Sequence, residues 1–339
     1  MKPKILMARA VFPEVIASLQ QHFEVESNQD DRIFSAAELA QKLSDKDGVI
    51  ATASERISAE LLQACPRLKA VCNQAVGYNN IDVAAATKAG VMVTNTPDVL
   101  NETTADFGWA LLMATARRVT ESEHWLRAGH WKQWRYDSFL GADVHGATLG
   151  IIGMGRIGQA IARRSLGFGM QVLYHNRSRL APELEARANN ARYAGKEELL
   201  AAADHVILVL PYSKESHHTI GAAELALMKP GATLVNLARG GIVDDLALIA
   251  ALRDKKIAAA GLDVFENEPA LDPGFLELSN VVLTPHIASA SEPTRRAMAD
   301  CAAANLLAAL LPTAERRWPP NLLNPEVLGR ATLSRATHS

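Results

Sequence analysis

Short apolar runs alternate with amphipathic segments along almost the whole chain. In the first hundred residues the apolar runs are "KILMA", "GVIAT", "LKAVCN" and "GVMVTN". A second series follows, made of "ATLGIIG", "QVLYH", "HVILVL", "ATLVNL", "AAAGLDV" and "VVLTP". Each run has the length and composition of a buried strand, and helical patterns lie between the runs. This alternation predicts an α/β protein with two doubly wound domains, each a parallel sheet covered by helices on both faces.

Two longer helical patterns interrupt and end this series. "NETTADFGWALLMATARRV" has Asn101 or Thr103 as its N-cap, and Thr103 with Asp106 has the spacing of a capping box. This helix is apolar on more than one face, so we expect it to pack against two partners, such as the other domain or another subunit. A second helix is predicted from about Pro293 to Leu311. The proline-rich segment after it is expected to be ordered and extended, and the polar end "GRATLSRATHS" mobile.

Composition narrows the class of protein without assigning a function. A chain of 339 residues suggests about two domains, and 48% hydrophobic with 21% charged residues is ordinary for a globular protein. The net charge of -2 gives no electrostatic reason to expect nucleic acid or an anionic membrane as a partner. No apolar run approaches the roughly 18 residues that a membrane span needs. The three cysteines and the other ligand types lack metal-binding spacing, so no metal is predicted.

The N-terminus favours a cytoplasmic location. "MKPKILMARAVFPEV" has Arg9 inside its apolar run and Pro13 soon after, which suits a first β-strand better than a signal peptide. An odd number of cysteines without a framework spacing fits a reducing compartment. We therefore expect a cytoplasmic protein.

A glycine motif indicates a dinucleotide site. In "GATLGIIGMGRIGQAIARR", Gly153, Gly155 and Gly158 follow an apolar strand and open a helix with Ile157 and Ile161 on one face. The first glycine permits the tight turn, the second lets the backbone approach a pyrophosphate, and the third allows the helix to pack closely on the strand. The helix N-terminus offers free N–H groups to the phosphates. The alternative is a glycine turn that binds nothing.

The next strand ends in "HNRSR", where an NAD-binding fold usually carries an acid that accepts the ribose 2′-OH. No carboxylate lies between His175 and Arg179. Arg177 and Ser178 are suited to bind a 2′-phosphate, and Asn176 to hydrogen-bond the ribose. This turn predicts a preference for NADPH, with NADH as the alternative cofactor. The other interpretation is a solvated basic turn with mixed cofactor use.

Polar residues follow three later strands. Arg239 follows "TLVNLA", Asp263 ends "AAAGLD" with Glu268 just beyond, and His286 follows "VVLTP". Parallel strands deliver these residues to the same edge of the sheet, where the cofactor crevice lies. Arg239 can hold a carboxylate and a carbonyl oxygen in a planar fork. His286 can give a proton to a forming alkoxide while hydride arrives, and Glu268 can orient the ring. These residue types suit the reduction of a 2-keto acid.

The stretches "GIIGMGRIG", "NLARGGIVDD", "AGLDVFENEP" and "PHIASAS" resemble those of the D-isomer-specific 2-hydroxyacid dehydrogenases, and the resemblance covers nearly the whole chain. It implies a Rossmann dinucleotide-binding domain at residues 101–290, inserted in a flavodoxin-like substrate domain formed by residues 1–100 and 291–325. Residues 326–339 would form a C-terminal tail. The resemblance also implies Arg239, Glu268 and His286 as the catalytic trio and a homodimer as the assembly.

The finer resemblance is to the glyoxylate/hydroxypyruvate reductases, including their 2-ketogluconate reductase branch. It implies that the N–H groups of Val76 and Gly77 in "AVGYNNIDV" bind the substrate carboxylate. In "HWKQWRY" it implies that Trp134, or alternatively Trp131, reaches the neighbouring subunit's site. Ordinary interface packing is the other interpretation of both tryptophans.

The predicted cofactor site extends beyond the glycines and the basic turn. In "VLPYSKESHHTIG" we expect His217 and His218 to face different directions as loop residues and not to bind metal. Pro211 and Thr219 of this loop would flank the cofactor. The remaining predicted cofactor contacts are Thr104, Arg156, Ile157, Ala238 and Asp263.

The leading hypothesis is NADPH-dependent reduction of a small 2-keto acid to a D-2-hydroxy acid, with His286 as the proton donor. Glyoxylate, hydroxypyruvate and 2-ketogluconate are the candidate substrates. An NAD-dependent D-2-hydroxyacid dehydrogenase with another substrate is the nearest alternative. A corepressor-like protein that senses a dinucleotide is an alternative of another class, because such proteins share the fold and can carry the same trio.

Overall fold

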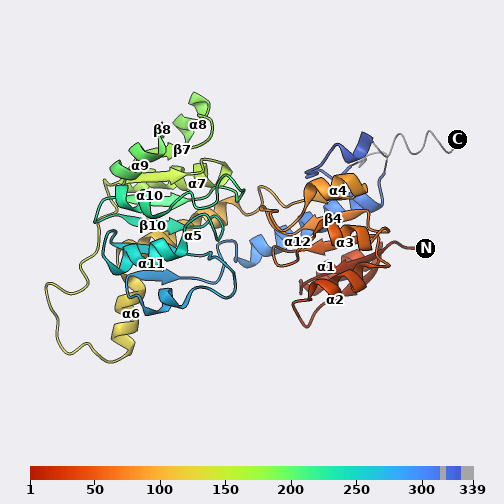
Figure 1. The fold of residues 1–339 in the computed structure, drawn as a ribbon, viewed down its shortest axis with the longest axis horizontal. Coiled ribbons are helices and arrows are strands. Elements are labelled where there is room, and N and C mark those ends of the chain that lie inside the picture. Colours follow the sequence, from red (N-terminus) through yellow and green to blue (C-terminus); the bar gives the residue numbers. More distant parts are fainter. Residues whose placement is uncertain (314–317, 330–339) are drawn as a thin grey trace. The chain divides into compact units, whose positions relative to one another are not determined.

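The computed structural model describes residues 1–313 and 318–329. The polar end predicted to be mobile lies almost wholly outside these residues. The chain divides into two compact units, one formed by Met1–Leu100 with the chain from Ser291 onward, the other by Asn101–Ala290 (Figure 1). Within the described residues, no helix is both long enough and apolar enough to cross a membrane.

The first unit contains a five-stranded, fully parallel sheet in the order β2-β1-β3-β4-β5. Its strands are β1 (Lys4–Met7), β2 (Glu24–Ser27), β3 (Gly48–Ala51), β4 (Ala70–Asn73) and β5 (Met92–Thr94). Its helices are α1 (Pro13–Gln20), α2 (Ala36–Leu43), α3 (Ala59–Ala64), α4 (Val83–Ala89) and α12 (Glu292–Leu310). Buried side chains of α1 and α12 cover one face, and those of α2, α3 and α4 cover the other.

The segment after α12 packs back on the first unit. The Asn324 side chain accepts a hydrogen bond from the Val93 N–H and donates to the Val91 carbonyl, each at 2.9 Å. The Leu323 N–H also donates to the Val93 carbonyl. Asn324 is 1% exposed and Val327 is 4% exposed. These contacts cover the edge strand β5, which would otherwise present unpaired backbone groups.

The second unit contains a seven-stranded parallel sheet in the order β12-β11-β10-β9-β6-β7-β8. Its strands are β6 (Thr148–Ile152), β7 (Gln171–His175), β8 (Arg192–Tyr193), β9 (His205–Leu208), β10 (Thr233–Asn236), β11 (Ala259–Leu262) and β12 (Val281–Leu283). Its α-helices are α5 (Asn101–Ala116), α6 (Val119–Arg127), α7 (Arg156–Arg164), α8 (Pro182–Arg187), α9 (Lys196–Ala202), α10 (Ala222–Leu227) and α11 (Asp245–Arg253). Two short 3-10 helices, η1 (Ser165–Phe168) and η2 (Pro273–Glu277), complete it.

The strand order contains a switch point beside β6. The chain runs outward from β6 through β7 to β8, then returns to β9 on the other side of β6. Loops after β6 and β9 therefore leave in opposite directions and open a crevice at the carboxyl edge of the sheet. This is where an open parallel sheet binds its ligands.

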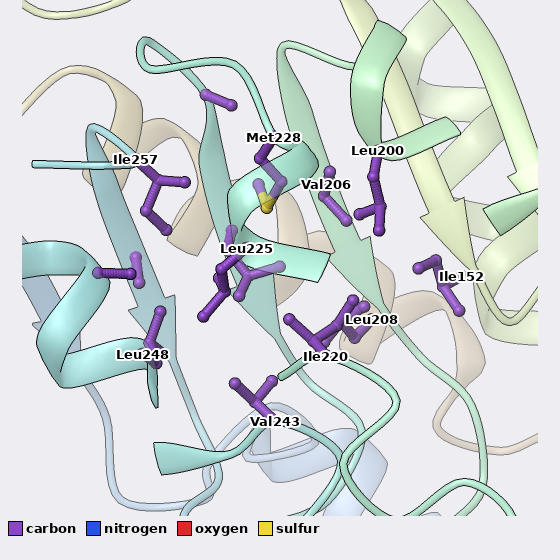
Figure 2. Packing of buried hydrophobic residues seen from close by; sticks show 14 of the residues in the cluster. Ile152, Leu200, Val206, Leu208, Ile220, Leu225, Met228, Val243, Leu248 and Ile257 are labelled. Atoms are coloured by element: carbon purple, nitrogen blue, oxygen red, sulfur yellow. The ribbon is translucent and has the colours of Figure 1, made fainter. Parts of the chain in front are cut away.

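Two apolar layers hold the second unit together. Residues of α9, α10 and α11, such as Leu200, Leu225 and Leu248, pack on one face of the sheet with Val206 and Leu208 of β9 (Figure 2). Residues of α5 and α7 pack on the other face with β6 and β7. The prediction of two parallel-sheet α/β domains is confirmed.

Both apolar faces of helix α5 pack against other elements of the second unit. The Trp109 indole donates to the Ile161 carbonyl of α7 at 3.0 Å and stacks on Phe168 at 4.6 Å. On the sheet side, a Cβ added at Gly261 of β11 would collide with the Thr115 side chain. The apolar positions are therefore explained by α7 and the sheet, and they require neither another domain nor another subunit. The helix also begins at Asn101, which places Thr103 inside its first turn.

The two strands that the apolar pattern missed are both edge strands. β2 is the stretch "EVES", with a single apolar residue and no fully buried position. β8 is only two residues long. Edge strands bury less surface than central ones, so their sequences carry a weaker apolar signal.

Candidate active site

The three motif glycines have different physical roles. Gly153, after β6, has φ +102°, and a Cβ there would overlap the backbone of Val209 and Leu210. A Cβ at Gly158 would overlap the carbonyl oxygen of Gly153, so this glycine lets α7 pack on the turn. Gly155 has nothing within 4 Å of its Cβ position and immediately precedes α7. It therefore leaves open the space where a pyrophosphate would meet the helix N-terminus.

The two arginines of the turn after β7, Arg177 and Arg179, have different surroundings. Arg179 makes two hydrogen bonds of 2.9 Å to Glu185, whose carboxylate also accepts from the Tyr174 hydroxyl at 2.6 Å. The Arg179 guanidinium and then the Tyr174 hydroxyl hold the pKa of Glu185 at about 2. Arg179 thus belongs to the fold, whereas Arg177 and Ser178 are exposed beside it.

Asn176 connects this turn to the glycine turn. Its side-chain oxygen accepts a hydrogen bond from the Met154 N–H at 2.8 Å. Arg156 and Ile157 begin α7, with Arg156 exposed and Ile157 half-buried. The structure therefore brings the predicted phosphate-binding turn and the predicted ribose-binding turn together at the ends of β6 and β7.

In the loop after β9, the structure corrects the prediction that His217 and His218 face different directions. The rings of His217 and His218 do not face apart: they stack with centroids 3.8 Å apart. His218 has φ +50°, a left-handed conformation that lets neighbouring side chains lie on one side. Pro211 and Thr219 flank this loop, and the Pro211 carbonyl and the Thr219 hydroxyl both bond to Ser216. Among the described residues no cluster of His, Cys, Asp or Glu could hold a metal ion.

The ends of β10, β11 and β12 bring a carboxylate and an imidazole together. The Glu268 Oε2 lies 2.8 Å from His286 Nδ1. Because a carboxylate only accepts, Nδ1 carries the proton and Nε2 is left for a ligand. Burial opposes ionisation of Glu268, but the hydrogen bond and charge of His286 outweigh it and lower the pKa of the carboxyl. The other oxygen, Oε1, accepts from the Phe265 N–H at 2.8 Å.

Arg239 lies in the turn after β10. It is half-buried, and one guanidinium nitrogen donates to the Ala238 carbonyl at 2.7 Å. Burial lowers the pKa of Arg239, while the charges of Glu268 and Asp263 act in the opposite direction. An arginine keeps its charge in proteins even so. The guanidinium is therefore a fixed cation close to the Glu268–His286 pair.

Asp263 holds the loop that carries His286. It is 0% exposed, and its carboxylate accepts hydrogen bonds from the Thr284 hydroxyl, the Ile287 N–H and the Ala288 N–H at 2.7 to 2.9 Å. His286, which lies between Thr284 and Ile287 in the chain, has φ +55°. The predicted contact of Asp263 with a cofactor stays a prediction, and the structure adds this supporting role. Thr104 in α5 and Ala238 are buried, at 5% and 4% exposed.

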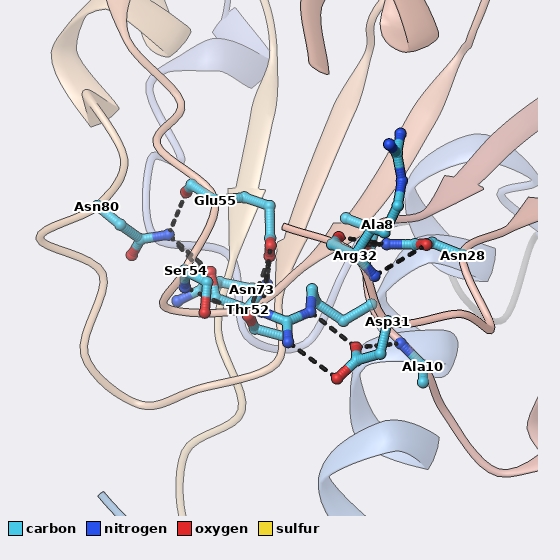
Figure 3. A network of polar contacts seen from close by, with 11 residues as sticks. Ala8, Ala10, Asn28, Asp31, Arg32, Thr52, Ser54, Glu55, Asn73 and Asn80 are labelled. Carbon is cyan, nitrogen blue, oxygen red and sulfur yellow. Dashed lines mark hydrogen bonds and ion pairs between the residues drawn. The ribbon is translucent and has the colours of Figure 1, made fainter. Parts of the chain in front are cut away.

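In the first unit, two asparagines hydrogen-bond to the backbone of the predicted substrate loop. Asn95 donates to the Val76 carbonyl at 2.9 Å and Asn73 donates to the Gly77 carbonyl at 2.8 Å. Asn80 ties the far end of the loop to the carbonyls of Thr52 and Glu55 (Figure 3). Within the described residues, the N–H groups of Val76 and Gly77 donate no hydrogen bond. The loop therefore presents two N–H donors suited to an anion.

Trp131 and Trp134 lie in the segment between α6 and β6. They are 59% and 74% exposed, and Trp134 contacts Tyr136 edge-on. Figure 1 shows α6 and this segment projecting from the rest of the second unit.

Comparison with known proteins decides the family. A model of the NAD binding domain of D-isomer specific 2-hydroxyacid dehydrogenases matches residues 109–288. A glyoxylate reductase from Thermococcus onnurineus is 50% identical over 332 residues, which cover 97% of this chain and 98% of the relative. The chain belongs to the D-isomer specific 2-hydroxyacid dehydrogenase family. It is thus an oxidoreductase with an NAD(P)-binding domain, as its motifs predicted.

Two solved structures of this family are similar to the dehydrogenase described here. A glyoxylate reductase from Paecilomyes thermophila has a TM-score of 0.85 at 33% identity, covering 96% of this chain and 99% of that one. An NADPH-dependent glyoxylate/hydroxypyruvate reductase from Sinorhizobium meliloti, solved with NADP and malonate, has a TM-score of 0.81 at 36% identity. It covers 95% of this chain and 99% of its own.

Sequence reasoning missed the residues that support the dehydrogenase's site. Asn73, Asn95, His218 and Glu266 all contact the backbone or side chains of predicted site loops. Each is an ordinary polar residue at a strand end or in a loop. The one available signal was position, because Asn73 and Asn95 directly follow apolar runs at the carboxyl edge of the first sheet.

The glycine roles predict opposite effects for two matched substitutions. Gly155→Ala adds a methyl group in open space, so the free energy of unfolding should change by less than about 1 kcal/mol. The same methyl should weaken NADPH binding by about tenfold or more, because it occupies the pyrophosphate approach. Gly158→Ala should instead destabilise the fold by about 1–3 kcal/mol through overpacking. Thermal unfolding and NADPH fluorescence titration measure both; a Gly155→Ala protein with wild-type affinity would contradict the assignment.

Proposed function

We propose that this dehydrogenase reduces glyoxylate and hydroxypyruvate, with 2-ketogluconate as a further candidate, to D-2-hydroxy acids at the expense of NADPH. The observation that carries the proposal is the 2.8 Å contact between Glu268 and His286 at the carboxyl edge of the nucleotide-unit sheet. Support for glyoxylate comes from the relatives named glyoxylate reductase, which are similar to this chain over nearly its whole length.

The proposed roles follow from the geometry of the trio. NADPH, when bound, supplies the hydride for the carbonyl carbon. His286 gives the proton on its Nε2 to the carbonyl oxygen as negative charge develops there. The Glu268 carboxylate, whose pKa is lowered beside His286, accepts from Nδ1–H and holds the ring in one orientation. Arg239 holds the substrate carboxylate and carbonyl oxygen, and it stabilises the developing charge without titrating.

The first unit by itself offers a candidate site for a carboxylate at the N–H groups of Val76 and Gly77. Asn95 holds the Val76 carbonyl, which shares a peptide unit with the Gly77 N–H, and Asn73 holds the Gly77 carbonyl. Backbone donors cost no reorganisation when the anion arrives. Such donors select a carboxylate but leave the rest of the substrate unspecified.

The preference for NADPH rests on the turn after β7. Arg177 is exposed and is not used by Glu185, which binds Arg179 instead. Glu215 of the neighbouring loop has a lowered pKa, first through its hydrogen bond with Ser213 and also through the charges of Lys214 and Arg177. A 2′-phosphate would bring a second anion to this cationic turn. The similar reductase from Sinorhizobium meliloti is described as NADPH-dependent.

Arg177→Asp tests this preference. The substitution replaces a charge-assisted hydrogen bond to the 2′-phosphate with repulsion, so the KM for NADPH should rise by about tenfold to a hundredfold. The KM for NADH, which lacks the phosphate, should stay within about twofold and serves as the internal control. Steady-state kinetics with both cofactors provide the measurement. Equal effects on the two cofactors would mean that the turn is only a solvated basic surface.

His286→Ala tests the proton-donor role. Loss of the imidazole should lower kcat for glyoxylate by about a hundredfold to ten-thousandfold, the range of a missing general acid. The dissociation constant for NADPH should remain near the wild-type value, because the ring contacts Glu268 and not the glycine turn. Stopped-flow turnover and fluorescence titration separate the two quantities. If NADPH binding is lost together with turnover, His286 has a structural role instead.

A homodimer completes the proposal. Five large apolar side chains on α6 and the segment after it are more than half exposed: Leu126, Trp131, Trp134, Tyr136 and Leu140. Large apolar side chains exposed together along one segment are typical of a protein interface. In a dimer Trp134 would reach the neighbouring subunit's site. Light scattering should give a mass near twice 36.6 kDa, and a mass near 36.6 kDa at assay concentration would refute the dimer.

A further inference from the structure

We propose that His218 is a positioning residue: it binds both the turn that carries Arg239 and the loop that carries Glu268, and it holds the two against each other. The inference rests on the proposed function, because it assigns to His218 an effect on the Glu268–His286 pair. It concerns a residue outside the predicted site, on the loop between β9 and α10, and His218 itself touches neither Arg239 nor His286.

The first contact of His218 is with the Arg239 turn. Its backbone N–H donates to the Gly241 carbonyl at 2.7 Å. The left-handed backbone of His218, at φ +50°, directs the N–H and the ring toward the two loops together. Histidine is among the few residues besides glycine that adopt this conformation with some frequency.

The second contact is with the Glu268 loop. His218 Nε2 lies 2.6 Å from Glu266 Oε1, and Glu266 is two residues before Glu268. The Glu266 N–H is held at the same time by the Asp245 carboxylate at 3.0 Å. Burial raises the pKa of Asp245 to about 6, and the charges of Glu266, Asp272 and Asp244 add to this effect. His218 therefore faces two carboxylates, because its Nδ1 also lies 3.9 Å from Asp244.

The Arg239 turn and the Glu268 loop also pack directly on each other. A Cβ added at Gly240 would overlap the carbonyl oxygen of Phe265. The Phe265 N–H in turn donates to Glu268 Oε1. A displacement of Glu266 therefore shifts its chain neighbour Phe265, and the Phe265 N–H is one of the two partners that orient the Glu268 carboxylate.

The expected consequence is a loss of proton transfer and not of cofactor binding. If Glu266 is released, Glu268 can leave its position 2.8 Å from His286, and the ring loses the partner that orients it. The proton donor is then misplaced relative to the carbonyl oxygen. Misplacement of a catalytic group by about 1 Å can lower a rate by about a hundredfold.

The experiment compares His218→Ala with His218→Gln in the full-length enzyme, with glyoxylate and NADPH as the substrates. Both variants carry the same left-handed backbone, so their difference reports the side chain alone. The glutamine amide can still donate to Glu266. His217→Ala is the matched control, because it removes the ring that stacks on His218 and bonds Tyr212 but leaves the His218–Glu266 contact in place. Glu266→Ala removes the same contact from the other side and serves if His218→Ala does not fold.

The proposal predicts that His218→Ala lowers kcat by tenfold or more, whereas the KM for NADPH stays within about twofold. His218→Gln should recover most of the rate, Glu266→Ala should behave like His218→Ala, and His217→Ala should match the wild type. Wild-type kcat in His218→Ala would overturn the proposal, as would no recovery in His218→Gln or an equal loss in His217→Ala.

Glu268→Gln separates this inference from the proposed function. If Glu268→Gln lowers kcat and His218→Ala does not, the positioning role alone fails. If the wild type does not reduce glyoxylate, the proposed function fails, and crystal structures decide the positioning role independently. In that case the Glu268–His286 contact must lengthen in His218→Ala and persist in His218→Gln; an unchanged contact in both would overturn the proposal.

Discussion

The candidate site depends on the close packing of two backbone turns. Gly240, next to Arg239, lies against the Phe265 carbonyl so tightly that no side chain fits between them. Phe265 then bonds Glu268, and Glu268 bonds His286. The parallel strands β10, β11 and β12 deliver these turns to one edge of the sheet, where this contact sets their register. Three polar residues far apart in sequence thereby become one chemical unit.

The parts of the fold with strong periodic signals could be predicted from the sequence. Central strands such as "HVILVL" are buried on both faces, so their apolar character follows from their position. The glycine motif was equally informative, because Gly153 and Gly158 have steric roles that only glycine fills. Edge strands β2 and β8 gave no such signal, since their burial is partial or their length minimal.

The supporting residues of the site could not be predicted, and the reason is physical. His217 and His218 stack because His218 adopts a left-handed backbone, a conformation that tertiary contacts with Gly241 and Glu266 impose. Asp263 has a second role that its sequence position did not indicate, because its buried carboxylate holds the loop that carries His286. Glu185, six residues after Arg179, binds that arginine, and nothing in the sequence indicated this pair. Local sequence does not encode such partners.

The most direct test of the account is the initial rate of the wild-type enzyme with NADPH and with NADH, against glyoxylate, hydroxypyruvate and 2-ketogluconate. The account predicts rapid oxidation of NADPH with at least one of these 2-keto acids and a clearly lower kcat/KM with NADH. Absence of turnover with all three acids, while NADPH still binds, would contradict reduction of small 2-keto acids. Equal or better use of NADH would contradict the reading of the turn after β7 as a phosphate site.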